Sequence, residues 1–277
     1  MSENPGLIVR DLEIFSADGQ TLVGPVSFDF NPGQRLGLIG ESGSGKSLAA
    51  LAIIGLLPDG LSSRGSIELG GRQLVGAPER IMNTVRGTDV AVVFQEPLTA
   101  LDPLMRIGKQ LAEPLRRRAA ADGERLTRQQ LRLLVRERLA DVRLPDPDAI
   151  ALAFPHQISG GQRQRAALAI ALSGRPSLLI ADEPTTALDV TVQSEILDLL
   201  DRLVDERGMS LLFISHDLAV VARIAPRVVV LQKGLVVEEG MLADVLANPR
   251  HAYTHELVDS ARSLDNALDD ALNGRDA

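Results

Sequence analysis

The sequence predicts an α/β fold that combines a mostly parallel sheet with an antiparallel β subdomain and an α-helical subdomain. Three observations support this prediction. Apolar runs at residues 35–39, 178–181, 211–215 and 228–231 alternate with helical segments, residues 7–30 alternate apolar and polar side chains, and residues 104–144 have helical spacing. With 277 residues, 45% of them hydrophobic, the chain can bury the core of one large domain or of a domain with a subdomain.

The first part of the chain is predicted to form antiparallel strands. Residues 7–30 are divided by two turn signals, Asp18-Gly19 and Gly24-Pro25. A further hairpin is expected from residues 66–69 and 72–74, joined by Gly70-Gly71. Residues 90–94 are predicted to be a buried strand.

Residues 104–144 are rich in Arg, Leu and Ala, are interrupted at Asp122-Gly123 and are closed by Pro145 and Pro147, which predicts a helical insertion. Eleven Lys or Arg residues stand against five Asp or Glu residues between positions 106 and 143. A solvated helix face is the favoured interpretation of this excess, and a binding patch is the alternative.

After the insertion, strands at residues 178–181, 211–215 and 228–231 alternate with helices, as in a mostly parallel sheet. A short strand is expected at residues 235–239, between Gly234 and Gly240. We place one domain at residues 1–258, with a helical subdomain at about 95–173, and an acidic, flexible tail at residues 259–277.

The most informative motif matches the pattern G-x-x-x-x-G-K-[ST] and stands between the strand 35–39 and a helix that begins near Lys46. Its residues are Gly40, Glu41, Ser42, Gly43, Ser44, Gly45, Lys46 and Ser47. Glycines allow the backbone N–H groups to surround phosphate oxygens, and the helix N-terminus adds positive potential. The motif predicts a site for ATP, with Lys46 on the β and γ phosphates and the Ser47 hydroxyl on Mg²⁺.

A second group of residues follows the strand 178–181. Asp182 is expected to hold Mg²⁺, and Glu183 to orient or deprotonate the attacking water. Taken alone, this pair is also compatible with an ordinary strand end. A third group opens an Ala- and Arg-rich helix and consists of Ser159, Gly160, Gly161 and Gln162. It offers a second phosphate-binding surface, so we expect a dimer in which each ATP lies between the two copies.

These motifs together resemble the ATP-binding subunit of ABC transporters over residues 7–253. The resemblance identifies Gln95 with the Q-loop, residues 158–162 with the signature, Ala187-Leu188-Asp189 with the D-loop and His216 with the switch histidine. It implies that Gln95 senses the γ phosphate and Mg²⁺ and that His216 positions the catalytic water. Each has a structural alternative, in which Gln95 caps a strand and His216 closes one.

Phe15 precedes the phosphate loop where members of this family usually carry an aromatic side chain that stacks on adenine, although a buried strand phenylalanine is the alternative. The stretches at residues 95–103, 154–157 and 248–254 resemble the branch that imports peptides or nickel. The resemblance implies transmembrane permeases, a second ABC ATPase that is identical or related, and indirectly an external solute-binding protein. It also implies a peripheral position on the cytoplasmic face of the inner membrane.

The composition excludes several classes of function and binding site. The formal net charge of −8 argues against broad binding to nucleic acid, and the absence of cysteine excludes disulfides, thiolate metal sites and the iron-sulfur cluster of some members of this branch. No Asn-Lys-x-Asp motif for guanine occurs. The main rival is a soluble ABC protein that acts as a clamp on ribosomes or DNA, but neither a second ATP motif nor a long coiled coil is present. A regulatory module is disfavoured by Glu183 and His216.

Overall fold

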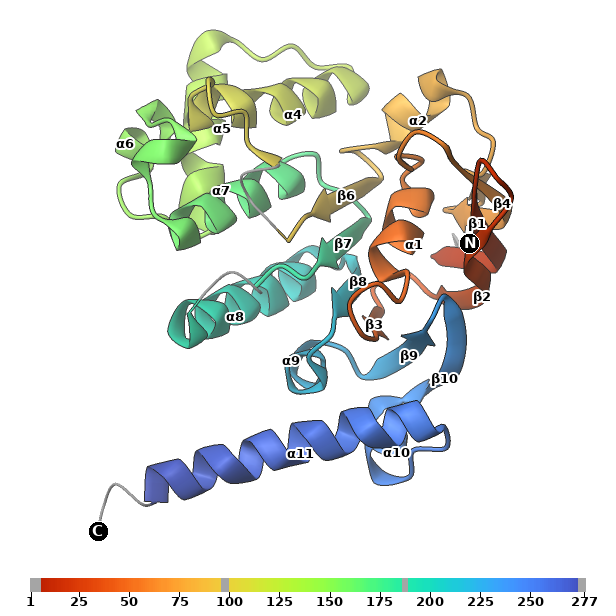
Figure 1. The fold of residues 1–277 in the computed structure, drawn as a ribbon. Coiled ribbons are helices and arrows are strands. Elements are labelled where there is room, and N and C mark those ends of the chain that lie inside the picture. The colour runs from red at the N-terminus through yellow and green to blue at the C-terminus, as the bar shows by residue number, and fades with distance from the viewer. Residues whose placement is uncertain (1–5, 96–99, 186–188, 274–277) are drawn as a thin grey trace.

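The computed structural model describes residues 6–95, 100–185 and 189–273, which form two sheets and the helices around them (Figure 1). The strands are β1 (Leu7–Ser16), β2 (Thr21–Phe30), β3 (Arg35–Ile39), β4 (Leu61–Leu69), β5 (Arg72–Gln73), β6 (Val90–Val93), β7 (Leu178–Asp182), β8 (Ser210–Ser215), β9 (Arg227–Gln232) and β10 (Leu235–Met241). The helices are α1 (Lys46–Ile53), α2 (Glu79–Val85), α4 (Ile107–Ala121), α5 (Arg128–Asp141), α6 (Pro147–Leu152), η1 (Pro155–Gln157), α7 (Gly160–Leu172), α8 (Val190–Arg207), α9 (Leu218–Ile224), α10 (Leu242–Ala247) and α11 (Ala252–Asn273).

The larger sheet has six strands in the order β10-β9-β3-β8-β7-β6. All neighbours are parallel except β9 and β10, which pair antiparallel. The carboxyl ends of β3, β6, β7 and β8 therefore meet at one edge of the sheet, where ligands bind in open α/β folds. The amino ends of the same strands form the opposite edge, and the two edges carry different chemistry.

The smaller sheet is antiparallel in the order β2-β1-β4-β5, as the sequence predicts. The turn expected at Asp18-Gly19 joins β1 to β2. The turn expected at Gly24-Pro25 is wrong, because this pair lies inside β2. There the register with β1 shifts between Leu12 and Ile14, so Gly24-Pro25 marks a strand irregularity; a Cβ on Gly24 would come within 2.2 Å of the Leu12 carbonyl oxygen.

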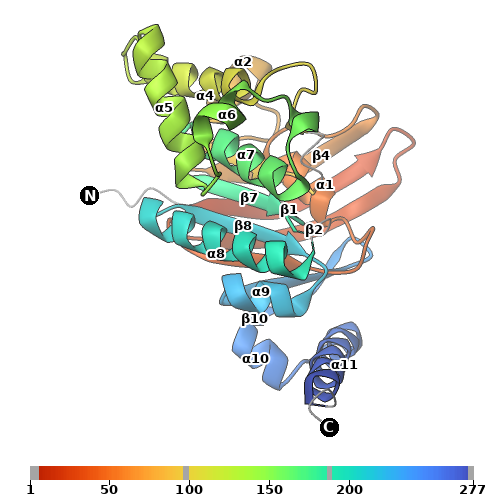
Figure 2. The same cartoon turned by 90° about the vertical axis from the view of Figure 1, so that its left-hand side faces the viewer.

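Two hydrophobic clusters lie on the two faces of the six-stranded sheet. Along β7, Leu178 and Ile180 join the cluster shared with α1 and the antiparallel sheet, whereas Leu179 and Ala181 join the cluster shared with α4, α5, α7 and α8. This alternation follows from the pleat, which directs successive side chains to opposite faces. Figure 2 shows α8 along the second face, between α7 and α9. Both faces are covered, which explains why the strands are almost continuously apolar.

The helical region between β6 and β7 comprises α4, α5, α6 and α7 and falls within the predicted range 95–173. Helix α5 begins with a capping box, in which the Thr127 side chain accepts from the Gln130 N–H and the Gln130 side chain accepts from the Thr127 N–H. The break expected at Asp122-Gly123 separates α4 from α5. The exact domain limits remain predictions.

The C-terminal stretch is helical. The sequence predicts a flexible tail from Asp259, and the described chain forms helix α11 through this stretch to Asn273; its flexibility stays a prediction. Buried Val258, within α11, packs into the core. Among the described helices, none combines the length and apolar character that crossing a bilayer requires.

Candidate nucleotide site

A pocket of about 820 Å³ lies at the carboxyl edge of the six-stranded sheet. It is lined by residues that follow four different strands, so the parallel topology itself gathers them. The predicted site residues that line it are Glu41, Ser42, Gly43, Gly45, Lys46, Ser47, Gln95, Glu183 and His216. The structure thus brings together the loop 40–47 and the polar residues after β6, β7 and β8.

The side chain of Lys46 is the buried cation of this pocket, with only 3% of its surface exposed. Its Nζ donates to the carbonyl oxygens of Gly40 at 2.7 Å and Glu41 at 2.8 Å. Burial lowers the pKa of Lys46, and the nearby carboxylates of Glu183, Asp182 and Glu41 oppose this shift. The ammonium is therefore fixed inside the loop, where phosphate oxygens can replace the carbonyl contacts.

Three glycines of the loop have separate structural roles. Gly43 and Gly45 have φ values of 80° and 100°, which are strained for residues with a side chain. A Cβ on Gly40 would lie 2.2 Å from the Leu231 carbonyl oxygen. Gly45 is the N-cap of α1 and provides no side-chain cap, so the first N–H groups of α1 remain available to an anion.

Ser47 and Asp182 supply a pair of oxygen atoms suited to Mg²⁺. Ser47 Oγ donates to Asp182 Oδ1 at 3.1 Å, which joins the start of α1 to the end of β7. Burial raises the pKa of Asp182, and the Glu183 carboxylate acts in the same direction, whereas Ser47 and Lys46 oppose them. A divalent cation would stabilise the ionised Asp182 carboxylate in this buried position. A hydroxyl with one carboxylate also fits the few protein ligands that Mg²⁺ takes beside phosphates.

Glu183 and His216 lie on neighbouring strand ends. Asp182 is in register with Ile214, so the residues that follow them meet across β7 and β8. His216 Nδ1 lies 3.2 Å from Glu183 Oε2, and the Glu183 side chain is only 13% exposed. Glu183 has φ 45°, a positive value that is uncommon for a residue with a side chain. Backbone strain at a largely shielded carboxylate beside a histidine is typical of functional sites.

The segment around His216 is fixed by its neighbours. The Ser215 Oγ accepts from the Asp217 N–H at 3.0 Å. The Asp217 carboxylate caps α9 by accepting from the N–H groups of Ala219 and Val220. The imidazole is therefore presented by a capped helix start rather than by a free loop.

Two predicted residues occupy different positions relative to the pocket. Gln95 is exposed, follows β6 and lines the pocket. Phe15 is half-buried in β1, pairs with Thr21 and lies under the Arg64 guanidinium, whose carbon is 6.0 Å from the ring centroid. It is not among the described residues that line the pocket, whereas Leu22, the next residue after Thr21, is. Adenine stacking by Phe15 therefore stays a prediction.

Residues 159–162 form the start of α7 and are not among the described residues that line the pocket. Ser159 and Gln162 form a capping box, with distances of 3.2 Å and 2.9 Å. A Cβ on Gly161 would lie 2.8 Å from Val192 Cγ1, so Gly161 permits α7 to approach α8. A Cβ on Gly160 would lie 3.9 Å from Arg163 Nη2, an ordinary contact, and Ser159 is exposed. Asp189 caps α8 by accepting from the Val192 N–H, while Ala187 and Leu188 lie outside the described residues.

Helix α11 forms a wall of the pocket that the sequence reasoning missed. Tyr253, Glu256, Leu257 and Ser260 line it beside the loop 40–47. Burial raises the pKa of the Tyr253 phenol, and the charges of Glu41 and Glu256 add to this, although the Glu41 backbone opposes it. The only signal in the sequence was the single tyrosine of the chain, in the stretch 248–254.

Buried Glu238 of β10 fixes the start of α11. Its carboxylate accepts from the N–H groups of Arg250 at 3.0 Å and His251 at 3.0 Å. Burial alone would favour the neutral acid, but these hydrogen bonds keep the pKa of Glu238 below its usual value. The anchor thereby holds Tyr253 against the phosphate loop.

Comparison with known proteins identifies relatives that agree in family. A family model described as ABC transporter matches residues 23–186. The chain is 47% identical over 259 residues to the "Peptidoglycan transport ATP-binding protein YejF" of Agrobacterium fabrum, covering 92% of this chain and 46% of that protein. It is 44% identical to a "Putative peptide import ATP-binding protein" of Brucella ovis, covering 97% of this chain and 81% of that one. It is 41% identical to the "Oligopeptide transport ATP-binding protein OppD" of Bacillus subtilis, covering 96% and 74%.

Among solved structures, a similar one is the "Dimeric structure of a post-hydrolysis state of the ATP-binding cassette MJ0796 bound to ADP and Pi". The TM-score is 0.74 at 26% identity, and the match covers 85% of this chain and 98% of that one. The P-loop α/β core with its antiparallel and helical subdomains, which the sequence predicts, is thereby confirmed.

Proposed function

Because the chain belongs to the ABC transporter family, we propose that it binds and hydrolyses ATP to drive the import of peptides through a membrane. One observation carries the proposal. A buried lysine, a serine-carboxylate pair and a glutamate-histidine pair, from separate segments, gather at one edge of the sheet. This is the set that hydrolysis of a phosphoanhydride requires: a phosphate clamp, a Mg²⁺ site and a water-activating base.

Lys46 and the N–H groups of the loop 40–47 bind and orient the β and γ phosphates. Ser47 and Asp182 would hold Mg²⁺, with Gln95 as a further oxygen ligand. The metal supplies neutralisation of phosphate charge when bound. Because Lys46 is buried and already fixed by two backbone contacts, little side-chain entropy remains to be lost when ATP binds.

Glu183 accepts a proton from the attacking water, whose oxygen forms the new bond to the γ phosphorus. The bond from that phosphorus to the bridging oxygen breaks, and ADP leaves with the electron pair. His216 positions Glu183 and the water, supported by the contact of 3.2 Å between the two side chains. The position of Glu183 at the end of β7, lining the pocket beside His216, supports its role as a base.

A second copy, or a related ATPase, completes the site with its residues 159–162. This step is supported by two features: residues 159–162 do not line the pocket of their own chain among the described residues, and Ser159 is exposed. The similar protein MJ0796 is described as dimeric with ADP and Pi. ATP would thus close the dimer, and hydrolysis would reopen it.

The permease partner would dock in a surface groove of about 410 Å³ between the core and the helical region. It is lined by apolar Leu56 and Phe94 from the core side and by Gln110 and Arg117 of α4. Phe94 directly precedes Gln95, so a movement at the phosphates can reach this groove through one peptide bond. This arrangement supports a peripheral position on the cytoplasmic face of the membrane, held by permeases that are served by an external solute-binding protein.

The names of the three relatives support peptides, or peptide-containing fragments, over nickel as the cargo. The rival clamp on ribosomes or DNA is less well supported, because a compact set of helices, α4 to α7, fills the insertion in the described part of the chain. Reconstitution with the cognate permeases tests the cargo: ATP turnover that rises with short peptides supports the proposal, and turnover that rises only with nickel contradicts it.

Glu183→Gln tests the chemistry. The variant keeps the size of the side chain but removes the base, so we expect ATP turnover to fall by about 10² to 10⁴ while ATP binding remains. It should also accumulate as an ATP-bound dimer in gel filtration. The matched control is Glu239→Gln, an exposed glutamate of β10, which should retain normal turnover. Wild-type turnover by Glu183→Gln would refute the role of Glu183.

A further inference from the structure

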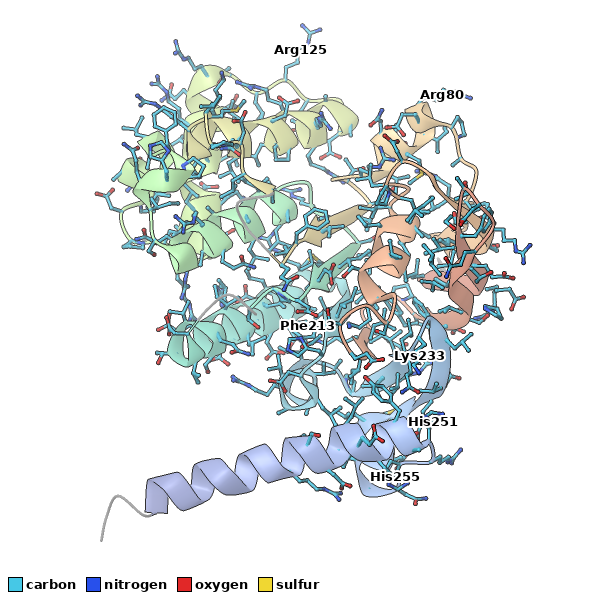
Figure 3. All side chains as sticks on the ribbon, in the orientation of Figure 1. Arg80, Arg125, Phe213, Lys233, His251 and His255 are labelled. Atoms are coloured by element: carbon cyan, nitrogen blue, oxygen red, sulfur yellow. The ribbon has the colours of Figure 1, made fainter. Side chains whose placement is uncertain are left out.

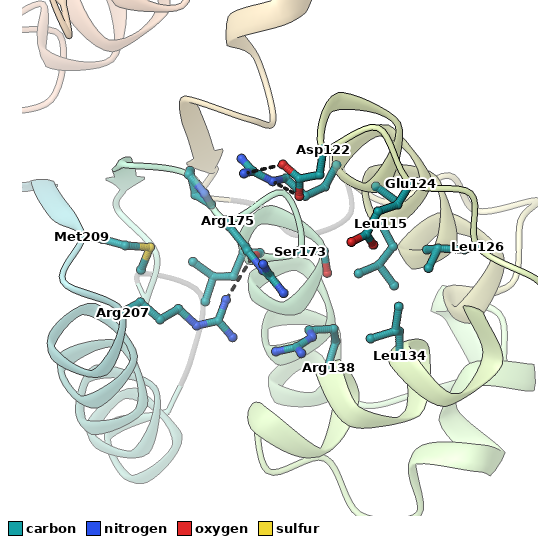
Figure 4. A pocket seen from close by; sticks show the side chains of 14 residues that line it. Leu115, Asp122, Glu124, Leu126, Leu134, Arg138, Ser173, Arg175, Arg207 and Met209 are labelled. Atoms are coloured by element: carbon teal, nitrogen blue, oxygen red, sulfur yellow. Dashed lines mark hydrogen bonds and ion pairs between the residues drawn. The ribbon is translucent and has the colours of Figure 1, made fainter. Parts of the chain in front are cut away.

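A second pocket, of about 450 Å³, lies at the opposite edge of the sheet from the nucleotide site (Figure 4). Pro176 and Met209, which line it, precede β7 and β8, whereas the nucleotide site follows the ends of these strands. The other walls are α4, α5, the C-terminal end of α7 and the end of α8. The pocket is therefore built between the helical region and the core.

Four arginines and two carboxylates, Asp122 and Glu124, line this pocket, and Arg138 Nη2 also lies 3.8 Å from Glu137 Oε2 beside it. Arg138 Nη1 contacts Asp141 Oδ2 at 2.6 Å, and Arg207 Nη2 contacts the same oxygen at 3.2 Å. Asp141 is thus shared between two guanidinium groups. Arg118 is satisfied separately, by two hydrogen bonds to Asp122 at 3.0 Å and 2.8 Å.

Arg207 is the best fixed of these groups. Its Nη1 donates to the Leu172 carbonyl oxygen at 2.9 Å, at the C-terminal end of α7, and its side chain is 20% exposed. Burial lowers the pKa of Arg207, and the nearby charges of Arg138 and Arg175 act in the same direction, while Asp141 and Glu206 oppose them. The like charges are close enough to interact, so an anion between them would be stabilised.

Arg175 adds a cation from a separate segment. It is exposed, has φ 54° and forms no side-chain hydrogen bond or ion pair within the described part of the chain. Figure 4 shows Arg138, Arg175 and Arg207 directed toward the same part of the pocket. Glu124, which also lines the pocket, supplies one negative charge nearer to Leu115 and Leu126. The three arginines therefore leave a cationic end.

The rest of the wall is apolar. Leu115, Leu126, Leu134 and Met209 line it, and all four lie in or beside the hydrophobic core. A pocket of this volume with a few charged groups at one end has the size and composition of small-molecule sites. The charged end selects an anion, and the apolar wall selects a ligand with an apolar group.

We propose that this pocket binds a small organic anion, a carboxylate or phosphate attached to an apolar group, with the anionic group between Arg138, Arg175 and Arg207. Guanidinium forks match both carboxylates and phosphates. The bound molecule bridges α4 and α5 to the core at the far end of α7, about 18 Å along that helix from Gly160. It therefore occupies a site separate from the nucleotide pocket and from the groove lined by Phe94 and Arg117.

Titration calorimetry of the full chain tests the proposal, with the phosphate loop saturated by ADP so that it does not bind the probes. The probes are phenylacetate and phenyl phosphate, with phenethylamine and 2-phenylethanol as the cationic and neutral counterparts. We expect saturable binding of at least one anion and none of the counterparts. Tighter binding of phenylacetate would identify a carboxylate as the preferred anionic group, and tighter binding of phenyl phosphate would identify a phosphate.

Arg175→Glu should weaken binding of that anion by at least about 10-fold. Because Arg175 is exposed, this change leaves the core packing intact. Arg80→Glu makes the same charge change at an exposed position of α2, a helix that contributes no described residue to the pocket lining, and should leave the affinity within about twofold (Figure 3). Arg207→Gln, checked for native circular dichroism, provides a second test within the pocket.

Absence of binding by both anions at about 10 mM would overturn the proposal. Equal losses in Arg175→Glu and Arg80→Glu would do so as well, because they would indicate a general charge effect. These outcomes do not depend on ATP hydrolysis, so they are distinct from a failure of the proposed transport function.

Discussion

The two edges of the six-stranded sheet hold opposite balances of charge. At the carboxyl edge, one buried cation, Lys46, faces three carboxylates, Glu41, Asp182 and Glu183. At the amino edge, four arginines and two carboxylates line the pocket; Arg138 and Arg207 share Asp141, and Arg138 also lies near Glu137. Helix α7 connects the two edges, since it begins with residues 159–162 and ends at Leu172.

This difference shows two ways to prepare a site for anions. The carboxyl edge offers backbone N–H groups and a helix start, which suit phosphate although its side chains are largely acidic; under the proposed function its carboxylates would serve metal and water. The amino edge has no loop of this kind and uses an excess of guanidinium groups. Backbone recognition leaves a sequence motif, whereas side chains from separate segments do not.

At the carboxyl edge, substitution of Lys46 should weaken ATP binding more than any other change considered below. Lys46→Ala removes the one buried cation of the carboxyl edge, and we expect ATP to bind about 10- to 100-fold more weakly, as measured by titration with a fluorescent ATP analogue. Lys109→Ala, at an exposed position of α4, is the matched control and should bind normally. Normal binding by Lys46→Ala would mean that the backbone of the loop suffices.

Phe15 tests whether the carboxyl edge also recognises the base. If Phe15 stacks on adenine, Phe15→Ala should weaken ATP binding by about 2- to 10-fold. The binding of inorganic tripolyphosphate, which has no base, should be unchanged. If both ligands lose affinity equally, Phe15 contributes to the packing of β1 instead. If the affinity for ATP is unchanged, Leu22 or Tyr253 contacts the base.

Replacing one carboxylate should shift the melting temperature in opposite directions at the two edges. Asp182→Asn removes a buried carboxylate whose pKa is raised by burial, so the melting temperature without nucleotide should rise by about 2–4 °C at pH 8. A raised pKa means that the folded state binds this proton more tightly than the unfolded state. The destabilisation is therefore absent below the usual aspartate pKa of about 3.9 and complete only above the raised value. The gain should disappear as the pH falls toward 4.

At the amino edge, Asp141→Asn should lower the melting temperature by about 2–4 °C, because it leaves Arg138 and Arg207 without their shared carboxylate. Addition of an anion that binds the pocket should restore part of the loss. Differential scanning fluorimetry measures both variants under one set of conditions. Changes of the same sign at the two edges would contradict the contrast in charge balance.

Much of the fold and the nucleotide site could be predicted, because their signals are local. The loop 40–47 has a fixed spacing, and the apolar runs that became β3, β7, β8 and β9 are bounded by polar residues. Glu183 and His216 each follow such a strand directly, so their proximity follows from parallel pairing.

The missed features depend on tertiary contacts. Gly24-Pro25 has the composition of a turn, yet pairing with β1 on one side and the close approach of Gly234 on the other keep it within β2. Helix α11 has a weak local signal, and its start is fixed by Glu238 on a distant strand. The arginine pocket draws on α4, α5, α8 and the segment after α7, so no single stretch of sequence encodes it.

Helix α11 extends from the nucleotide pocket as a long arm. Its first turn touches the nucleotide pocket through Tyr253, while its described end at Asn273 stands away from the sheet (Figure 1). Its 22 residues make a lever arm of about 33 Å. A tilt of about 5° at the tyrosine would displace the tip by about 3 Å. A spectroscopic label near residue 273 would therefore magnify events at the phosphates into a measurable change of distance.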